Sequence, residues 1–309
     1  MKHAAKKRSS YSIYEHHGSP SDIVSSLPFY AVLLLFIGLM TMLAGFWTVR
    51  ASFIQDTPQA DMQSVPMDIE QVSNETTASA EIRVPILLYH YVEHLKDPKD
   101  SIRRSLTISP ETFESQIMTL IHDGYTFLTV SDLVAAMRGH ASLPAKPIVL
   151  TFDDGHWDLA TDVLPILNKY HVQATAYIIS GFIGQSDFLS DAQLREVINS
   201  GLVEIGSHTV HHLQMAKLPG AQLSDEVRIS KQHLERTYKL HIVSFAYPSG
   251  SFDQAAINMV RQTGYQSAVS TIPGVQQSES NRYFLARIRP GAKTGKELLQ
   301  FLAQDQFNK

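Results

Sequence analysis

Short apolar runs and helical patterns alternate along the chain from Val84 onward. Apolar runs of strand length cover 84–89, 146–152, 174–180, 203–206 and 243–247. Between them, apolar residues recur at helical spacing in segments that open near residues 110, 131 and 163, and over 191–199, 223–238 and 255–262. This alternation predicts a parallel-stranded α/β domain, either a barrel or a doubly wound sheet. In both architectures, the residues that carry chemistry lie at the carboxyl ends of the strands.

Capping residues mark several of the predicted helix ends. Ser109 precedes a proline at the start of the first helix, which is typical of an N-cap followed by proline in the first turn. Ser131 is the residue that we expect to open the second helix. Glycines follow three of the helical patterns, at Gly124, Gly201 and Gly264, and glycine commonly ends a helix.

The segment from Phe29 to Val49 is one uninterrupted apolar run, and no charged residue occurs between Asp22 and Arg50. As a helix it would span roughly 30 Å, the thickness of the hydrocarbon core of a bilayer, with Trp47 near the interface. A buried core helix would normally be shorter and carry a polar stripe. A cleaved signal peptide usually has a shorter apolar stretch and a shorter leader. The run therefore favours one uncleaved transmembrane helix.

Basic residues before this run set its predicted orientation. Lys2, Lys6, Lys7 and Arg8 favour a cytoplasmic N-terminus, so the rest of the chain would lie outside the cytoplasmic membrane. Residues 50–83 are polar and lack periodicity, as expected of a linker. The predicted organisation is a basic cytoplasmic leader (1–28), a transmembrane anchor (29–49), a polar linker (50–83) and a folded domain (84–309).

Composition narrows the classes of protein to which this chain can belong. Hydrophobic residues make up 44% and charged residues 18% of its 309 residues, which is ordinary for a chain with a packed core. There is no cysteine, so disulfide scaffolds, cysteine-ligated metals and thiol nucleophiles are excluded. The formal net charge is −4, and −7 for residues 51–309 alone, which argues against a nucleic-acid-binding protein.

Two adjacent acids, Asp153 and Asp154, come directly after the apolar run that ends at Phe152. Like charges repel each other at the edge of a low-dielectric core, and a cation relieves that repulsion. Neighbouring side chains also point to different sides, so one acid can bind a metal while the other faces a substrate. An Asp-Asp-Gly turn with only a capping role is the alternative, and this motif alone does not separate the two.

A histidine-rich segment, HTVHH at 208–212, follows the apolar run 203–206. The i, i+4 spacing predicts that His208 and His212 lie on one side of a helical turn, where two imidazoles can bind one divalent ion. His211 offers an i, i+3 alternative with His208, and a histidine-rich surface loop would give the same pattern. Together with the two acids about 55 residues earlier, the segment predicts a metal site with open positions for water and substrate.

These two motifs resemble those of the polysaccharide deacetylases of the NodB-homology type, carbohydrate esterase family 4. TFDDG at 151–155 matches the first motif of that family, and HTVHH at 208–212 matches its H-[S/T]-x-x-H motif. The resemblance runs from Val84 to the C-terminus, so it implies that residues 84–309 are the catalytic domain. The fold that it implies is a distorted (β/α)7 barrel, in agreement with the alternation of strands and helices.

The resemblance also implies a divalent metal cofactor, usually Zn²⁺, and assigns roles to the two motifs. The metal ligands carried over are Asp154, His208 and His212. The first acid of the pair, Asp153, is the implied general base. His156, directly after the Asp-Asp-Gly turn, receives no role.

The third motif departs from the common family pattern of Arg-x-Pro-Tyr. Residues 245–250 read FAYPSG, so Ala246 stands where the arginine that supports the base would be. This version is similar to the subgroup that contains the poly-N-acetylglucosamine deacetylases of biofilm systems. In that subgroup a histidine after an early strand is the general acid, and His90 matches it, with a structural buried histidine as the alternative. Arg287 is the candidate for the missing cationic support, with a surface ion pair as the alternative.

The resemblance implies metal-dependent hydrolysis of N-acetyl groups from an extracytoplasmic N-acetylglucosamine polysaccharide. Asp153 would take a proton from metal-bound water, a backbone N–H at Ser249 beside Pro248 would stabilise the oxyanion, and His90 would protonate the leaving amine. Tyr247 is a candidate for stacking on a sugar ring. Two alternatives stay open, namely an esterase for O-acetyl groups and an inactive glycan-binding module of the cell envelope.

Overall fold

The predicted strands are present in the computed structural model, which describes residues 81–95, 97 and 99–304. The strands of its central sheet are β2 (Ile86–Tyr89), β5 (Thr126–Leu128), β6 (Pro147–Phe152), β7 (Ala174–Ile178), β8 (Val203–Ser207), β9 (Ser244–Ala246) and β10 (Ser267–Val269). They follow the order β10-β9-β8-β7-β6-β2, with β5 also bonded to β6, and all of these pairs are parallel. The parallel α/β class that the alternation predicts is confirmed.

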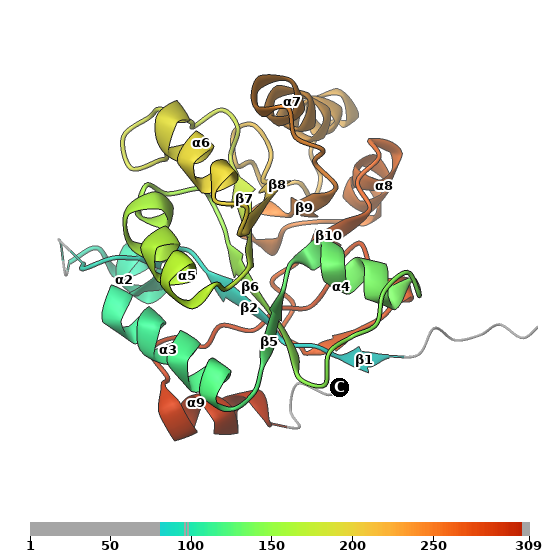
Figure 1. The fold of residues 1–309 in the computed structure, drawn as a ribbon. Helices are drawn as coiled ribbons and strands as arrows, with labels where there is room; N and C mark the ends of the chain where they lie inside the picture. The colour runs from blue at the N-terminus through green and yellow to red at the C-terminus, as the bar shows by residue number, and fades with distance from the viewer. Residues whose placement is uncertain (1–80, 96, 98, 305–309) are drawn as a thin grey trace, which may run out of the picture. The chain divides into compact units, whose positions relative to one another are not determined.

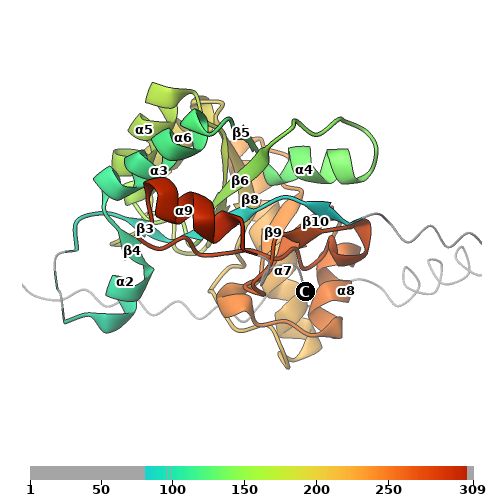
Figure 2. The same ribbon diagram turned by 90° about the horizontal axis from the view of Figure 1, so that it is seen from below.

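Helices surround this sheet (Figure 1). They are α2 (Ser101–Leu106), α3 (Pro110–His122), α4 (Val130–Met137), α5 (Leu164–Tyr170), α6 (Asp191–Asn199), α7 (Gly220–Tyr238), α8 (Gln254–Gln262) and α9 (Gly295–Leu302). A π-helical turn, Leu159–Val163, leads into α5. All six predicted helices are present, and α9, which the sequence did not indicate, packs alongside α3 (Figures 1 and 2).

Short elements complete the described structure. β1 (Ile82–Arg83) pairs antiparallel with β11 (Gln276–Gln277), and β3 (Tyr91–Val92) pairs parallel with β4 (Thr107–Ile108). Two single turns of 3₁₀-helix lie at Pro248–Gly250 and Glu279–Asn281. The third motif begins in the last two residues of β9 and ends in the first of these turns.

Side-chain caps fix where the helices begin. The Ser109 hydroxyl accepts the backbone N–H of Thr112 at 3.2 Å, as predicted for the start of α3. At α4 the cap is Thr129, whose hydroxyl accepts the N–H of Asp132 at 3.1 Å while the Asp132 carboxylate accepts the N–H of Thr129 at 3.0 Å. The prediction that Ser131 opens this helix was wrong, because the reciprocal pair starts it one residue earlier.

Neighbouring residues of the sheet strands belong to two different apolar clusters. Ile86 and Val149 lie in a small cluster that α4 completes, whereas Leu87 and Ile148 lie in a larger one that extends under the other helices. Both faces of these strands are therefore buried. This explains why the segments are continuous apolar runs in the sequence rather than alternating ones.

Residues 285–288 connect the two edges of the sheet. The Leu285 N–H donates to the Ala268 carbonyl of β10 at 2.8 Å, and Ile288 exchanges hydrogen bonds of 2.9 Å with Ile86 and Leu88 of β2. The parallel sheet of the predicted (β/α)7 barrel is confirmed, and this segment stands at the position where the barrel would close. It also carries Arg287 between the two sets of bonds.

The predicted leader, transmembrane anchor and linker fall almost wholly outside the described residues. Of the linker, only residues 81–83 are included. Across the ranges that the structure does describe, no helix combines the length and the hydropathy that a membrane crossing requires. The anchor at 29–49 and the domain boundaries around it stay predictions.

Candidate metal centre of the domain

Asp153 and Asp154 leave the end of β6 in different directions. Asp154 and Gly155 both have positive φ, 75° and 80°, so the chain turns sharply directly after the strand. The φ of Gly155 lies in the left-handed region that favours glycine, and a Cβ atom there would also lie 2.9 Å from Cδ1 of Ile178, which would have to shift. Asp153 is buried against Arg287, whereas Asp154 faces His208 and His212.

The three predicted metal ligands converge. One ligand atom from each of Asp154, His208 and His212 lies within 4.8 Å of the other two. Asp154 Oδ1 is 3.4 Å from Nε2 of His208 and 3.4 Å from Nε2 of His212. This oxygen is buried with no hydrogen-bond donor, an arrangement that normally costs free energy. Two imidazole nitrogens and one unpaired carboxylate oxygen fit a divalent cation in charge and in donor type.

The histidine segment is an irregular loop. The prediction of a helical turn over 208–212 was wrong, because Thr209 and His212 have φ of 65° and 57°. The Thr209 hydroxyl accepts the N–H of His212 at 3.0 Å and so holds the loop closed. His208 Nδ1 lies 2.8 Å from the Ala246 carbonyl, which can only accept, so Nδ1 carries the proton and the lone pair of Nε2 faces Asp154.

Glu226 of α7 holds the middle of this loop. Its Oε2 accepts the N–H groups of Val210 and His211 at 3.0 and 2.9 Å, and its Oε1 lies 2.7 Å from Nδ1 of His211. The alternative in which His211 and His208 share a metal is wrong, because His211 is bonded to Glu226 and is not part of the ligand cluster. Sequence reasoning did not single out Glu226, since it lies on a helix far from both motifs.

Arg287 and Asp153 form a buried, bidentate ion pair. Nη1 and Nη2 of Arg287 lie 2.7 and 2.8 Å from Oδ1 and Oδ2 of Asp153. The guanidinium also donates to the Ser270 carbonyl at 2.8 Å and to the Thr151 hydroxyl at 3.1 Å. Burial alone would raise the pKa of Asp153, but the charge and hydrogen bonds of Arg287 bring it below its usual value. A cation thus supports this acid although Ala246 replaces the usual arginine.

The comparisons with known proteins agree with this geometry. Residues 140–268 match the profile of the polysaccharide deacetylase family. YxkH of Bacillus subtilis (strain 168), which its name places among the polysaccharide deacetylases, is 29% identical over 263 residues, or 83% of this chain and 91% of its own length. The poly-β-1,6-N-acetyl-D-glucosamine N-deacetylase of Staphylococcus aureus (strain MSSA476) is 26% identical over 198 residues, or 60% of this chain and 68% of the relative.

A solved structure of a deacetylase is also similar to this chain. The deacetylase PplD of Streptococcus pyogenes, determined in complex with acetate, superimposes with a TM-score of 0.67 and 27% identity over 73% of this chain and 100% of its own. The chain is therefore similar to polysaccharide deacetylases over the part that carries both motifs. The resemblance that rests on TFDDG and HTVHH is confirmed.

His156 is a residue of the candidate metal centre that the motifs left without a role. Its Nε2 lies 3.3 Å from Oδ2 of Asp154, its Nδ1 lies 3.1 Å from the Asp187 carbonyl, and its ring stacks between Tyr91 and Phe188. Burial would raise the pKa of Asp154, but hydrogen bonds, first among them the one to His156, hold it well below its usual range. His156 therefore fixes one carboxylate oxygen while the other faces the histidines.

His156→Phe is expected to weaken zinc binding by roughly 10-fold to 100-fold, because the phenyl ring keeps the stack but cannot bond to Asp154. The zinc dissociation constant, measured by competition with a chromophoric chelator, tests this. His140→Phe, at an exposed histidine, is the matched control. A folded His156→Phe protein that binds zinc within twofold of wild type would show that His156 has no positioning role.

His90 follows β2 at the carboxyl end of the sheet. Burial lowers its pKa from 6.5 to about 4, and the negative charges of Asp153 and Asp154 offset this effect only in part. The Asp153 N–H donates to the carbonyl of Tyr89, the residue before His90, at 3.0 Å, so His90 follows a strand that is bonded next to the two acids. The imidazole is neutral at pH 7, so a proton has to reach it during a reaction in which it acts as an acid. Its role as the general acid stays a prediction.

The lowered pKa of His90 has a consequence for stability. Between pH 6.5 and 4 the unfolded chain binds a proton at this position that the folded domain does not, so acidification favours unfolding. The free energy of unfolding of the metal-free domain, measured by urea titration with a chelator present, is expected to fall across this window. His90→Gln should reduce that slope, whereas His140→Gln should not. If the free energy of unfolding falls equally with pH for His90→Gln and for wild type, the pKa of His90 is not lowered by burial.

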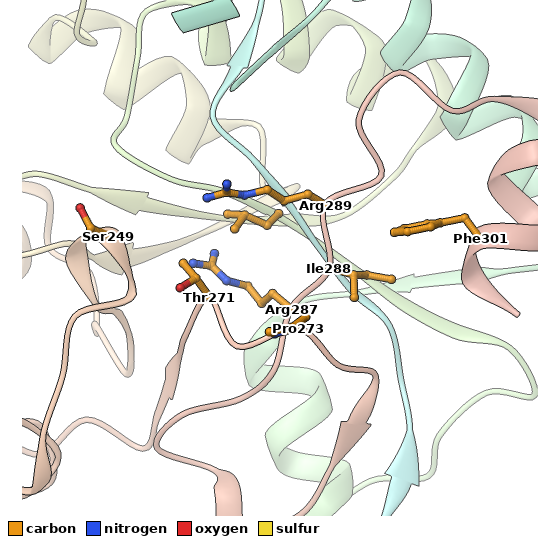
Figure 3. Close-up of a pocket in the computed structure, with 8 residues that line it drawn as sticks. Ser249, Thr271, Pro273, Arg287, Ile288, Arg289 and Phe301 are labelled. Atoms are coloured by element: carbon orange, nitrogen blue, oxygen red, sulfur yellow. The ribbon is translucent and has the colours of Figure 1, made fainter. Parts of the chain in front are cut away.

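One prediction about the third motif, that Tyr247 stacks on a sugar ring, was wrong. The Tyr247 side chain is fully buried and its hydroxyl donates to the Tyr283 carbonyl at 2.9 Å, so it cannot stack on a sugar. Pro248 is also buried, whereas Ser249 is exposed, with φ of 54°. Ser249 lines a cavity of about 520 Å³ (Figure 3), so it is the part of this motif that a ligand can reach.

Proposed function

We propose that this domain removes N-acetyl groups from an N-acetylglucosamine-containing polysaccharide outside the cytoplasmic membrane and releases acetate. One observation carries the proposal, namely that Asp154, His208 and His212 converge beside a second acid, Asp153, which Arg287 holds ionised. A relative whose name assigns it to poly-β-1,6-N-acetyl-D-glucosamine supports the choice of substrate class. The predicted anchor at 29–49 supports the location.

The proposed cofactor is Zn²⁺, held by Asp154, His208 and His212. Two nitrogen ligands and one oxygen ligand are the protein donors of many catalytic zinc sites, which keep further positions open. When bound, such an ion lowers the pKa of a coordinated water toward neutrality and polarises a carbonyl oxygen. His208 is prepared for this role because its other ring nitrogen is fixed on the Ala246 carbonyl.

The residues of the chain then divide the proton transfers between them. Asp153 accepts the proton of the attacking water, and its ion pair with Arg287 keeps it deprotonated until then. The backbone N–H at Ser249 is the proposed donor to the oxyanion, since Ser249 and Arg287 line one cavity. His90 protonates the leaving nitrogen, and the proton that Asp153 has accepted is a source for it.

The experiment that tests this function measures acetate release with the full chain and added zinc. The substrates are chitin oligomers, poly-β-1,6-N-acetylglucosamine, peptidoglycan and O-acetylated xylan. Release from at least one N-acetylated polymer, with a metal content near one ion per chain, is expected. Release from xylan alone would assign the domain to O-acetyl esters, and binding without any release would assign it to the inactive glycan-binding modules.

The ion pair also bears on the alternative of an inactive module. The reason to consider that alternative was the missing arginine of the third motif, because an unsupported base would be protonated more readily. Arg287 reaches Asp153 from a different segment and supplies two hydrogen bonds. This ion pair supports an active domain, because it supplies the cation that the third motif lacks.

A further inference from the structure

A cavity of about 520 Å³ lies between residues 287–289 and Ser249 of the third motif. Arg287 and Arg289 line it, together with the polar side chains of Ser249 and Thr271. Figure 3 shows both guanidinium groups extending toward the same space, with Phe301 of α9 on the opposite side. Because Arg287 also binds Asp153, the cavity adjoins the proposed catalytic residues.

The two arginines of this cavity differ in their electrostatic state. The charge of Arg287 is balanced by Asp153, as described above. Arg289 is exposed, and within the described part of the chain it has no hydrogen bond or ion pair to a carboxylate. Lys293 extends the positive charge, with its Nζ 5.0 Å from the centre of the Phe301 ring. The cavity therefore presents at least one positive charge that the protein does not neutralise.

This concentration of positive charge is unusual within residues 51–309. Residues 287–296 read RIRPGAKTGK, with four basic residues and no acid, although residues 51–309 carry a net charge of −7. A general basic surface is therefore not the cause. The two basic residues that line the cavity, Arg287 and Arg289, both belong to this segment.

We propose that this cavity is a subsite for an anionic substituent, a carboxylate or a phosphate ester, on the sugar next to the one that is deacetylated. The inference rests on the proposed function and specifies its substrate class. A guanidinium has a planar set of donors that matches carboxylate and phosphate oxygens, and it binds them in pairs. The hydroxyl groups of Ser249 and Thr271 line the same cavity and can donate to the remaining oxygens.

The test compares three oligosaccharides of equal length with the zinc-loaded full chain. One is a neutral N-acetylglucosamine oligomer, one carries a carboxylate on alternate sugars, and one carries a phosphate ester there. The expected result is a kcat/KM at least about fivefold higher for one of the charged oligomers at low ionic strength. This advantage should shrink on addition of about 0.5 M salt, because salt shortens the Debye length and screens the attraction between the exposed guanidinium of Arg289 and the anionic group.

Two variants separate this subsite from a general charge effect. Arg289→Gln is expected to bring the ratio of charged to neutral kcat/KM close to one, whereas Arg138→Gln, at an exposed arginine outside the cavity, should leave the ratio at the wild-type value. Equal wild-type kcat/KM for all three oligomers, or a ratio that Arg289→Gln does not change, would overturn the inference. If no oligomer releases acetate, the proposed function itself fails, and that outcome is distinct from equal rates.

Discussion

Asp153→Asn is expected to lower kcat/KM for acetate release by at least about 100-fold while zinc binding stays within about threefold of wild type. A carboxamide cannot accept the proton of the attacking water, and a positioned general base contributes about 10²-fold to 10⁴-fold. Metal binding should persist because the ligand atoms belong to Asp154, His208 and His212. The measurement pairs initial rates on an N-acetylated oligomer with the metal content of the same sample.

Asp153→Asn also leaves Arg287 with a neutral partner in a buried site, so a folding control is needed. Circular dichroism and urea unfolding report whether the variant is folded under the assay conditions. Asp154→Asn is the matched comparison at the neighbouring position, and it is expected to lose metal as well as activity. A folded, zinc-loaded Asp153→Asn protein with a near wild-type rate would show that another group is the base.

Much of the fold could be predicted because its elements are long or strongly capped. The strand ending at Phe152 and the helix after Ser109 both appear in the structure where the sequence places them. β5 and β10 were missed because each has three residues and neither lies within a longer apolar run, whereas β9 is equally short but lies in the run 243–247. Their pairing depends on neighbours that are distant in sequence, namely β6 and β9.

The residues of the candidate metal site could be predicted, but the backbone that holds them could not. The spacing of His208 and His212 suggested a helical turn, while the observed loop depends on a local side-chain bond from Thr209 and on Glu226 of α7. The bonds to Glu226 form only when α7 packs against the loop, so the spacing of the histidines does not reveal them. His156 had one available signal, its position directly after the Asp-Asp-Gly turn at a strand end.

Tyr247 illustrates a different limit. An aromatic residue at the carboxyl end of a parallel strand can face a ligand or the core, and its residue type does not distinguish the two. Here the hydroxyl finds a carbonyl partner inside the protein, which makes full burial compatible with a polar atom. For Arg287, the sequence left open whether it supports the base or forms a surface ion pair. In the structure it forms the buried pair with Asp153.

Arg287→Met is expected to destabilise the domain by about 3–5 kcal/mol, because it leaves the buried carboxylate of Asp153 without its partner. Methionine has a similar length and no charge, so loss of volume is a small part of the effect. The same change removes the cation that lowers the pKa of Asp153, and burial then raises that pKa. Urea unfolding measures the first effect, and the acid limb of the pH profile of kcat/KM measures the second.

The direction in which the acid limb of kcat/KM moves depends on which protonation state of Asp153 is active. Asp153 works as a base only when deprotonated, so a raised pKa moves the acid limb of the Arg287→Met profile toward higher pH, and activity at neutral pH falls. Arg287→Lys keeps the charge but not the paired donors, so its acid limb should lie between those of wild type and Arg287→Met. A loss of stability with an unmoved acid limb in both variants would mean that Arg287 holds the fold together without tuning the base.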